Sequence, residues 1–157
     1  MWVNFSMSVK TTGSLDQALS RLVSSNEQHV QVGVLDNTKY PDGTSVASVA
    51  FWNEYGTDGR SGRAKIPPRP FFRDTIKQKK DEWSNLARQG IRVGYSIDKV
   101  LGLVGSKMQN DIQDTIDAFK TPPNAAYTVA MKGFDKPLIN TTLLRSSIKY
   151  EVKDGKL

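Results

Sequence analysis

Apolar and polar residues alternate in three short stretches of the chain, and each alternation predicts a β-strand. In residues 1–10, Val3, Phe5, Met7 and Val9 are set against Trp2, Asn4, Ser6 and Ser8. Residues 29–35 place three valines on one side, and residues 147–152 alternate again. A period of two is typical of a strand with one buried face. The three stretches therefore predict a small, mostly antiparallel sheet.

A helical spacing of apolar residues marks several segments between these strands. Ser14 is expected to cap a first helix, and Thr44 or Ser45 to cap a second one, which ends at a left-handed Gly56. A third helix is expected to begin near Pro70 and to run to about residue 89. Its apolar stripe consists of Phe72, Ile76, Trp83 and Leu86.

The longest predicted helix runs from about Ser96 to Phe119. Apolar residues three or four positions apart give it one continuous face, roughly 35 Å long at the rise of an α-helix. That face consists of Ile97, Leu101, Val104, Met108, Ile112, Ile116 and Phe119. Gly105 is expected to allow another backbone to come close. The sequence Thr121-Pro122-Pro123 ends the helix, and a short helical turn is expected near residues 140–145.

Together these elements predict an α+β fold. A small, mostly antiparallel sheet packs with three to four helices, one of them long and amphipathic. The 157 residues are enough for one domain with a substantial core, and we find no internal repeat or dividing linker. The whole chain, residues 1–157, is therefore expected to be a single domain.

The composition narrows the chemistry that the chain can perform. Hydrophobic residues make up 38% and charged residues 24%, as expected of a soluble globular protein. The absence of cysteine excludes disulfides, thiolate chemistry and zinc sites built on sulfur. The single histidine, His29, excludes a histidine-rich metal cluster and is interpreted as a strand-end residue without special chemistry. Neither a signal peptide nor a membrane span is recognised, so the chain is expected in the cytoplasm when made.

The formal net charge is +6, but the basic residues are spread along the chain. Modest concentrations occur at residues 60–73 and at Lys77, Lys79 and Lys80. They fit a solvated helix face with a basic loop, and they also fit attraction to nucleic acid or to acidic protein surfaces. Charge alone leaves both interpretations open.

The most informative feature is a pair of patterned segments joined by a loop. Residues 51–57 read Phe-Trp-Asn-Glu-Tyr-Gly-Thr, and residues 66–73 read Ile-Pro-Pro-Arg-Pro-Phe-Phe-Arg. The prolines forbid a helix before Pro70 and impose an extended strap. Residues 58–65 are polar, basic and contain glycine, so they are expected to form a flexible loop. Neither this region nor the later stretch of residues 132–141 gathers the residue types of a catalyst. Both fix the path of the backbone, and together they offer aromatic and arginine side chains to a large partner.

Five short motifs follow one another along the chain. They are Tyr-Pro-Asp-Gly-Thr (40–44), Val-Ala-Ser-Val-Ala (46–50), Asn-Glu-Tyr-Gly (53–56), residues 66–73, and Lys-Gly-Phe-Asp-Lys-Pro-Leu-Ile-Asn-Thr (132–141). In this order they resemble a family of tailed-bacteriophage proteins. The family comprises the neck, or tail-completion, proteins that join head and tail in long-tailed phages and prophages. The resemblance covers roughly residues 30–152. It implies a non-enzymatic virion subunit that forms a ring at the top of the tail tube, next to the tail-terminator or head-closure ring.

The chain departs from the family pattern at one place. After Pro-Leu-Ile the family has Asp-Thr-Gly, and this chain has Asn140-Thr141-Thr142. Asn140 is still expected to cap a helix. Thr142 is not expected to adopt the positive φ of a glycine, which puts the local backbone there in question.

Eight residues are candidates for contacts between subunits. They are Trp52, Glu54, Arg60, Arg63, Lys65, Arg69, Phe71 and Arg73. Glu54 lies in the last turn of its helix, where the dipole disfavours an anion, so an ion pair with Arg69 or Arg73 is expected, with a subunit contact as the alternative. Arg69, held between two prolines, is the strongest single candidate for an interface arginine.

The aromatic candidates have two interpretations each. Trp52 and Phe71 are either interface anchors or core residues, because large aromatic side chains dominate the energy of both. Phe72 and Val49 are expected in the core. Residues 58–65 are either an arm that becomes ordered on assembly or an ordinary surface loop.

The leading interpretation is a phage neck or tail-completion protein that forms a homo-oligomeric ring, expected to be sixfold. Its expected partners are copies of itself and the adjacent tail-terminator, tail-tube and head-closure proteins, within a virion assembled in the host cytoplasm. Positive charge is expected to allow non-specific contact with DNA in the channel. The alternative is a basic protein that binds nucleic acid as a monomer. No catalytic, cofactor or metal site is predicted, and a hydrolase has almost no support.

Overall fold

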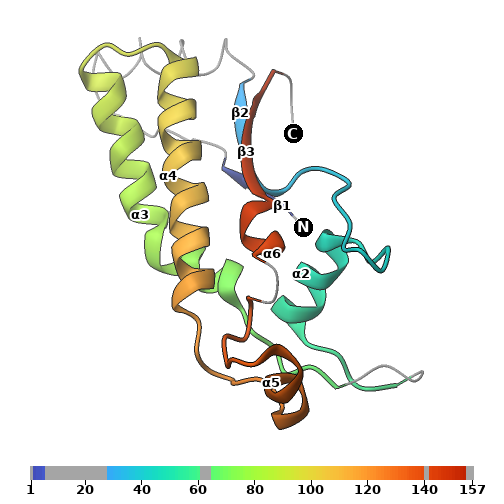
Figure 1. Cartoon of the computed structure of the whole chain (residues 1–157). Helices are drawn as coiled ribbons and strands as arrows, with labels where there is room; N and C mark the ends of the chain where they lie inside the picture. The colour runs from blue at the N-terminus through green and yellow to red at the C-terminus, as the bar shows by residue number, and fades with distance from the viewer. Residues whose placement is uncertain (1, 6–27, 61–64, 140–141, 155–157) are drawn as a thin grey trace.

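The computed structural model describes residues 2–5, 28–60, 65–139 and 142–154. Three strands form one antiparallel sheet in the order β1 (Trp2–Phe5), β2 (His29–Val34) and β3 (Ile148–Lys153). The central strand β2 pairs with β1 and with β3, so that both ends of the described chain lie in the sheet (Figure 1). The predicted small antiparallel sheet is confirmed. The helix expected after Ser14 lies outside the described residues.

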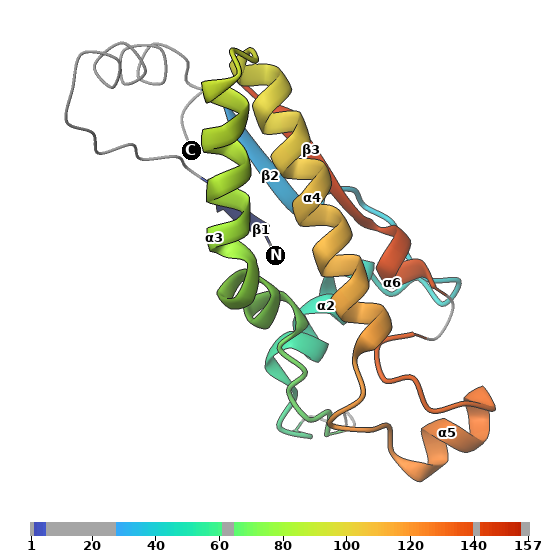
Figure 2. The same cartoon turned by 90° about the vertical axis from the view of Figure 1, so that its left-hand side faces the viewer.

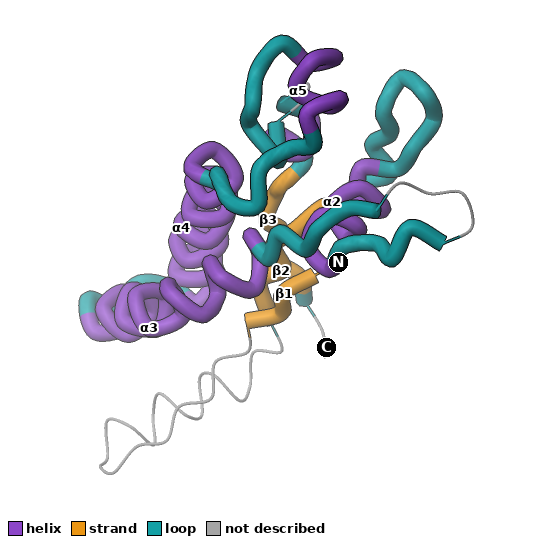
Figure 3. Tube along the Cα trace, turned by 90° about the horizontal axis from the view of Figure 1, so that it is seen from below, coloured by secondary structure: helices purple, strands orange, loops and turns teal. Residues whose placement is uncertain are grey.

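One face of the sheet is covered by a pair of long antiparallel helices. Helix α3 (Phe71–Arg92) turns back into α4 (Ile97–Ala118), and α4 crosses the face of β2 and β3 (Figure 2). Val30 and Val32 point into this layer and are fully buried. Seen from below, the two long helices lie on one side of the sheet and α2 lies on the other (Figure 3). The fold is therefore α+β, as predicted.

Helix α4 begins and packs as its sequence predicts. Ser96 is its N-cap and accepts a hydrogen bond from the Lys99 N–H at 3.3 Å. The predicted apolar face supplies buried core residues, namely Leu101, Val104, Met108, Ile112 and Ile116. Gly94, at φ 82°, makes the tight turn from α3 into α4.

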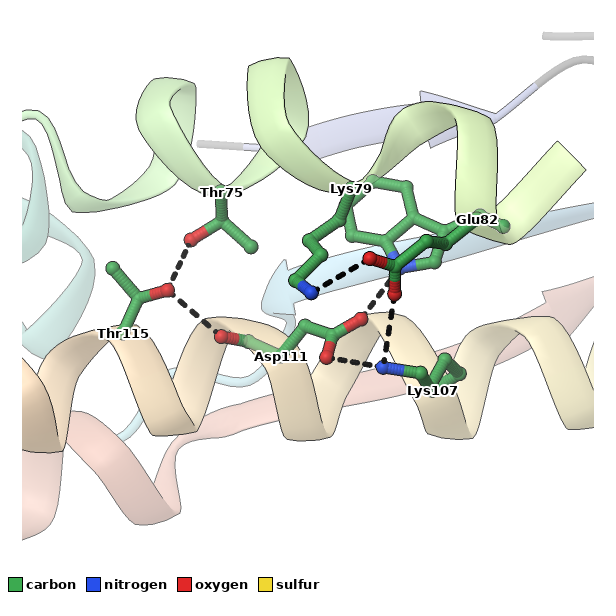
Figure 4. Close-up of polar contacts among 7 residues, drawn as sticks. Thr75, Lys79, Glu82, Lys107, Asp111 and Thr115 are labelled. Atoms are coloured by element: carbon green, nitrogen blue, oxygen red, sulfur yellow. Dashed lines mark hydrogen bonds and ion pairs between the residues drawn. The ribbon is translucent and has the colours of Figure 1, made fainter.

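A polar network joins the two long helices (Figure 4). The buried Trp83 donates its indole N–H to Asp111 at 2.7 Å, and Lys107 pairs with the other oxygen of the same carboxylate. Nearer the start of α3, the hydroxyls of Thr75 and Thr115 lie 2.7 Å apart. These contacts satisfy polar groups that would otherwise be costly to bury between helices.

Gly105 lets the sheet approach α4, but not as the sequence predicts. A Cβ atom there would lie 2.5 Å from Cδ2 of Tyr150 and 2.6 Å from Cγ2 of Val30. Side chains from β3 and β2 therefore fill the space beside Gly105, and the prediction that another backbone comes close there is wrong. Gly102, one turn earlier, has nothing within 4 Å of its added Cβ.

Three short helices lie beyond one end of the sheet. Helix α2 (Val46–Tyr55) contacts α6 (Leu143–Ser146), and α5 (Ala126–Lys132) lies furthest out (Figure 1). The short turn expected near residues 140–145 is α6, whereas α5 was not predicted. Thr142 precedes α6 at φ 59° and ψ −6°, so the expectation that it avoids positive φ is wrong. Within the described residues, no helix is long and apolar enough to cross a membrane.

Candidate functional site

Glu54 connects the end of α2 to the beginning of α3. Its side chain is fully buried. Its Oε2 accepts the Phe72 N–H at 2.9 Å, and its Oε1 accepts the Arg73 N–H at 3.1 Å. The carboxylate thus lies at the positive N-terminal end of α3 and supplies the cap that Pro70 cannot. The unfavourable position in the last turn of α2 is offset by a favourable one on the next helix.

The predicted ion pair of Glu54 forms with Arg73. The Arg73 Nε lies 2.8 Å from Glu54 Oε1, and Nη2 donates to the Glu54 carbonyl at 3.0 Å. The hydrogen bond with Glu54 raises the pKa of Arg73. The guanidinium also lies over the ring of Tyr55, 4.7 Å from its centroid. The alternative pair with Arg69 is wrong.

Arg69 is buried and bound to neutral oxygens. Its guanidinium donates to the carbonyls of Pro122 at 3.2 Å and Pro123 at 3.0 Å, and to Oδ1 of Asn53 at 3.0 Å. Burial lowers the pKa of Arg69. Only 6% of the residue is exposed, so it ties α2 and the strap to the segment after α4 and leaves little surface for another subunit.

The strap runs antiparallel to the end of α2 and is held by backbone bonds. The Arg69 N–H donates to the Asn53 carbonyl at 2.6 Å, and the Thr57 N–H to the Ile66 carbonyl at 2.9 Å. Gly56 has φ 75°, and a Cβ there would lie 2.7 Å from the Ile66 oxygen. Glycine is therefore required at this helix end, as predicted. The ψ of Gly56 is 178°, so the residue does not adopt the left-handed helical conformation that was expected.

A groove of about 750 Å³ lies between α2, the strap and α5. Its lining comes from each of the motifs that carry the resemblance. Tyr40 and Asp42 come from the first, Asn53 from the third, Arg69 from the strap, and Lys132, Pro137 and Leu138 from the last. Segments far apart in the sequence therefore meet at one concave surface, which makes it the candidate functional site.

The groove combines positive charge with apolar side chains. Lys65, Arg69 and Lys132 line it, and Asp42 is the one acidic residue of its described lining. Burial lowers the pKa of Lys132, and repulsion from Arg69 lowers it further. Chemically, such a surface suits an anion that carries apolar groups.

The remaining candidates occupy different environments. Phe71 is fully buried with Phe72, so the core interpretation is correct for both, whereas Val49 is only partly buried and lines the groove. Trp52 is also partly buried and lines the groove, as does the exposed Lys65. Arg60 is exposed and pairs with Asp58 at 3.2 Å. Arg63 lies outside the described residues, as does the rest of the 61–64 stretch of the 58–65 loop.

Four apolar side chains near this site are exposed, and none of them was among the candidate contact residues. On α5, Tyr127 is 77% and Met131 is 72% exposed. On α2, the rings of Phe51 and Tyr55 lie 4.8 Å apart and both are exposed. Each pair has the i, i+4 spacing of one helix face, and that spacing was the available signal.

The buried acids of the described residues are committed to structural bonds. Glu54 uses both carboxylate oxygens at α3, and Asp111 uses both on Trp83 and Lys107. No group of three or more histidine, aspartate or glutamate side chains suited to a metal is found among the described residues.

The chain matches none of the protein-family models, curated proteins or solved structures with which it was compared.

Proposed function

We propose that the chain is a structural subunit of a tailed-phage virion. It forms a ring, proposed to be hexameric, at the head–tail junction, where it connects the tail tube or tail terminator to the head-closure complex. It performs no chemical reaction in this role.

The convergence of the motifs on one groove carries the proposal. The motif residues hold one another in place, as in the bonds of Glu54 to α3 and of Arg69 to Asn53 and Pro123. A catalyst positions reactive groups toward a substrate, whereas these groups are bonded within the fold. Residues arranged in this way fix the shape of a surface, which is what a subunit of an assembly requires.

Exposed apolar residues support contacts with other proteins. Tyr127 and Met131 are largely exposed on α5, and Phe51 and Tyr55 form a pair on α2. Aromatic residues and methionine are enriched in protein–protein interfaces, and their exposure in a monomer is unfavourable. We assign these two helix faces to contacts between neighbouring subunits or rings.

The alternative of a monomer that binds nucleic acid has weaker support. The outer face of α3 carries the exposed Lys77, Lys80 and Arg88, but the exposed Asp74 and Asp81 interrupt it. A continuous basic stripe is the expected signature of duplex binding.

Virions provide the decisive test. Deletion of the gene from the phage or prophage that encodes the chain should yield filled heads and separate tails by electron microscopy. Complementation with the wild-type gene should restore joined, infectious particles that contain the protein. Fully joined infectious particles after deletion, or finished particles without the protein, would overturn the proposal.

Purified protein tests the assembly surface directly. Native mass spectrometry should detect ring-sized oligomers, and the double variant Tyr127→Ser, Met131→Ser should shift them toward monomers. Val93→Ser is the matched control, because Val93 is 67% exposed at the turn between α3 and α4. Equal loss of oligomers in both variants would contradict an interface on α5. Tight, salt-dependent binding of the monomer to duplex DNA at physiological salt would favour the alternative.

A further inference from the structure

We propose that the groove between α2, the strap and α5 binds an extended acidic peptide segment of another virion protein. The inference rests on the proposed function in one respect, namely that the peptide comes from another protein of the virion. The chemistry of the groove defines what the segment must contain, namely carboxylates beside apolar side chains.

The positive charge of the groove favours an acidic partner. Lys65, Arg69 and Lys132 line the groove, and among the described residues none of the three forms an ion pair. The hydrogen bonds of Arg69 go to carbonyl and amide oxygens, and the Lys132 Nζ donates to the Lys136 carbonyl at 2.9 Å. These bonds satisfy the donors without neutralising the charge.

The nearby carboxylates offset this charge only in part. Asp42 is exposed and accepts the Thr44 N–H at 2.9 Å. Asp135 accepts two hydrogen bonds from Asn124, each at 3.1 Å. Asp135 acts to raise the pKa of Lys132, yet burial and the repulsion from Arg69 keep that pKa below its ordinary value. A carboxylate bound in the groove would relieve the repulsion between the two cations.

The apolar part of the groove lining makes a bare anion a poorer match than an acidic peptide. Trp52, Ile66, Pro67 and Leu138 lie in the same groove as the cations. A phosphate or a DNA backbone would make no use of the apolar part of this lining, whereas an acidic peptide uses both halves of the surface. A volume of about 750 Å³ accommodates several side chains of an extended segment.

A peptide library tests this inference on the intact chain. One synthetic library of twelve-residue peptides mixes Asp and Glu with Leu, Phe, Pro and Ser, and a second replaces the acids by Asn and Gln. The immobilised protein should retain peptides from the acidic library, and the enriched ones should bind about tenfold or more tightly than their amide counterparts by fluorescence anisotropy. Addition of peptide should shift the indole N–H of Trp52 in the NMR spectrum.

Single-charge variants then locate the binding surface. Lys132→Gln and Lys65→Gln should each weaken binding of the acidic peptide several-fold, and Lys132→Arg should retain it. Lys77→Gln is the matched control, because Lys77 is exposed on α3 and outside the groove lining. Unfolding midpoints equal to that of the wild type show that the variants fold.

Three outcomes overturn the inference. They are no preference for the acidic library, equal loss of binding in Lys77→Gln and Lys132→Gln, and displacement of the peptide by single- or double-stranded DNA at lower concentration than by free peptide. Failure here leaves the ring and deletion tests unaffected, so the two proposals can fail separately. Virions that join normally with Lys132→Gln, while the acidic peptide no longer binds, would show that the groove is dispensable for joining.

Discussion

The carboxylate of Glu54 lies 2.9 Å from the backbone nitrogen of Phe72, so the last turn of α2 caps the first turn of α3. Residues 55–71, which include the proline strap, lie between them in the sequence, and the bond holds the two ends of this segment together. The position of the strap sets one wall of the groove. A single buried carboxylate therefore links helix stability to the shape of the candidate site.

Replacement of Glu54 by glutamine should destabilise the protein by about 2–3 kcal/mol. The amide keeps one acceptor oxygen but directs an NH₂ group at N–H donors of α3. Urea denaturation followed by circular dichroism measures the free energy of unfolding. Glu82→Gln is the control, because Glu82 is 51% exposed and pairs only at the surface. Its cost should stay within about 1 kcal/mol, and equal costs for both variants would contradict the capping role.

The fold was predictable where one periodic pattern spans an entire element. Val30 and Val32 alternate on β2, and the stripe of α4 from Leu101 to Ile116 keeps one face toward the core. Helix α5 escaped prediction because it has no buried residue, and without a core-facing stripe its sequence carries no clear helical period. A local sequence pattern predicts a helix when one face of that helix is buried, and α5 has no buried residue.

The partners of the site residues were only partly predictable. Both Arg69 and Arg73 lie within reach of Glu54 along the strap, and sequence spacing does not choose between them. Arg69 instead binds the carbonyls of Pro122 and Pro123, which are groups that every residue carries and that no sequence pattern marks. The convergence of the motifs on a groove likewise depends on tertiary packing.

Alanine substitutions at two glycines of α4 should have opposite effects. Gly105→Ala places a methyl group 2.5 Å from the Tyr150 ring and 2.6 Å from Val30, which forces the helix and sheet apart. We expect a net cost of about 1–3 kcal/mol, even though alanine favours the helix. Gly102→Ala meets open space and should stabilise the protein by up to about 1 kcal/mol. Urea denaturation measures the free energy of unfolding of both variants. Stabilisation by Gly105→Ala would contradict the packing described.

Thr142→Gly should stabilise the protein by up to about 1 kcal/mol. Thr142 holds φ 59°, which is unfavourable for a β-branched residue and free of cost for glycine. The gain is reduced by the greater entropy of glycine in the unfolded chain. Thr142→Ala keeps a Cβ atom and should show no comparable gain in thermal unfolding. If alanine stabilises as much as glycine, relief of the positive φ is not the cause.

The ion pair between Asp36 and Lys149 should make stability depend on acid pH. Asp36 Oδ2 lies 2.7 Å from the Lys149 Nζ, and this bond with those from Thr38 lowers the pKa of Asp36 from 3.8 to about 2. Because the folded-state pKa lies below the unfolded value, the contribution is complete above about pH 4 and is lost as the pH falls toward 2.

Removal of the carboxylate isolates this contribution from those of other acids. The free energy of unfolding of Asp36→Asn should fall less steeply between pH 4 and 2 than that of the wild type, with a small difference because both side chains are partly exposed. Lys149→Gln should flatten the same window, and the double variant should add little to either single change. Urea titrations at several pH values measure these slopes, and 1 M salt should reduce the difference. Parallel slopes for Asp36→Asn and the wild type would show that this pair does not tie the 36–45 loop to β3.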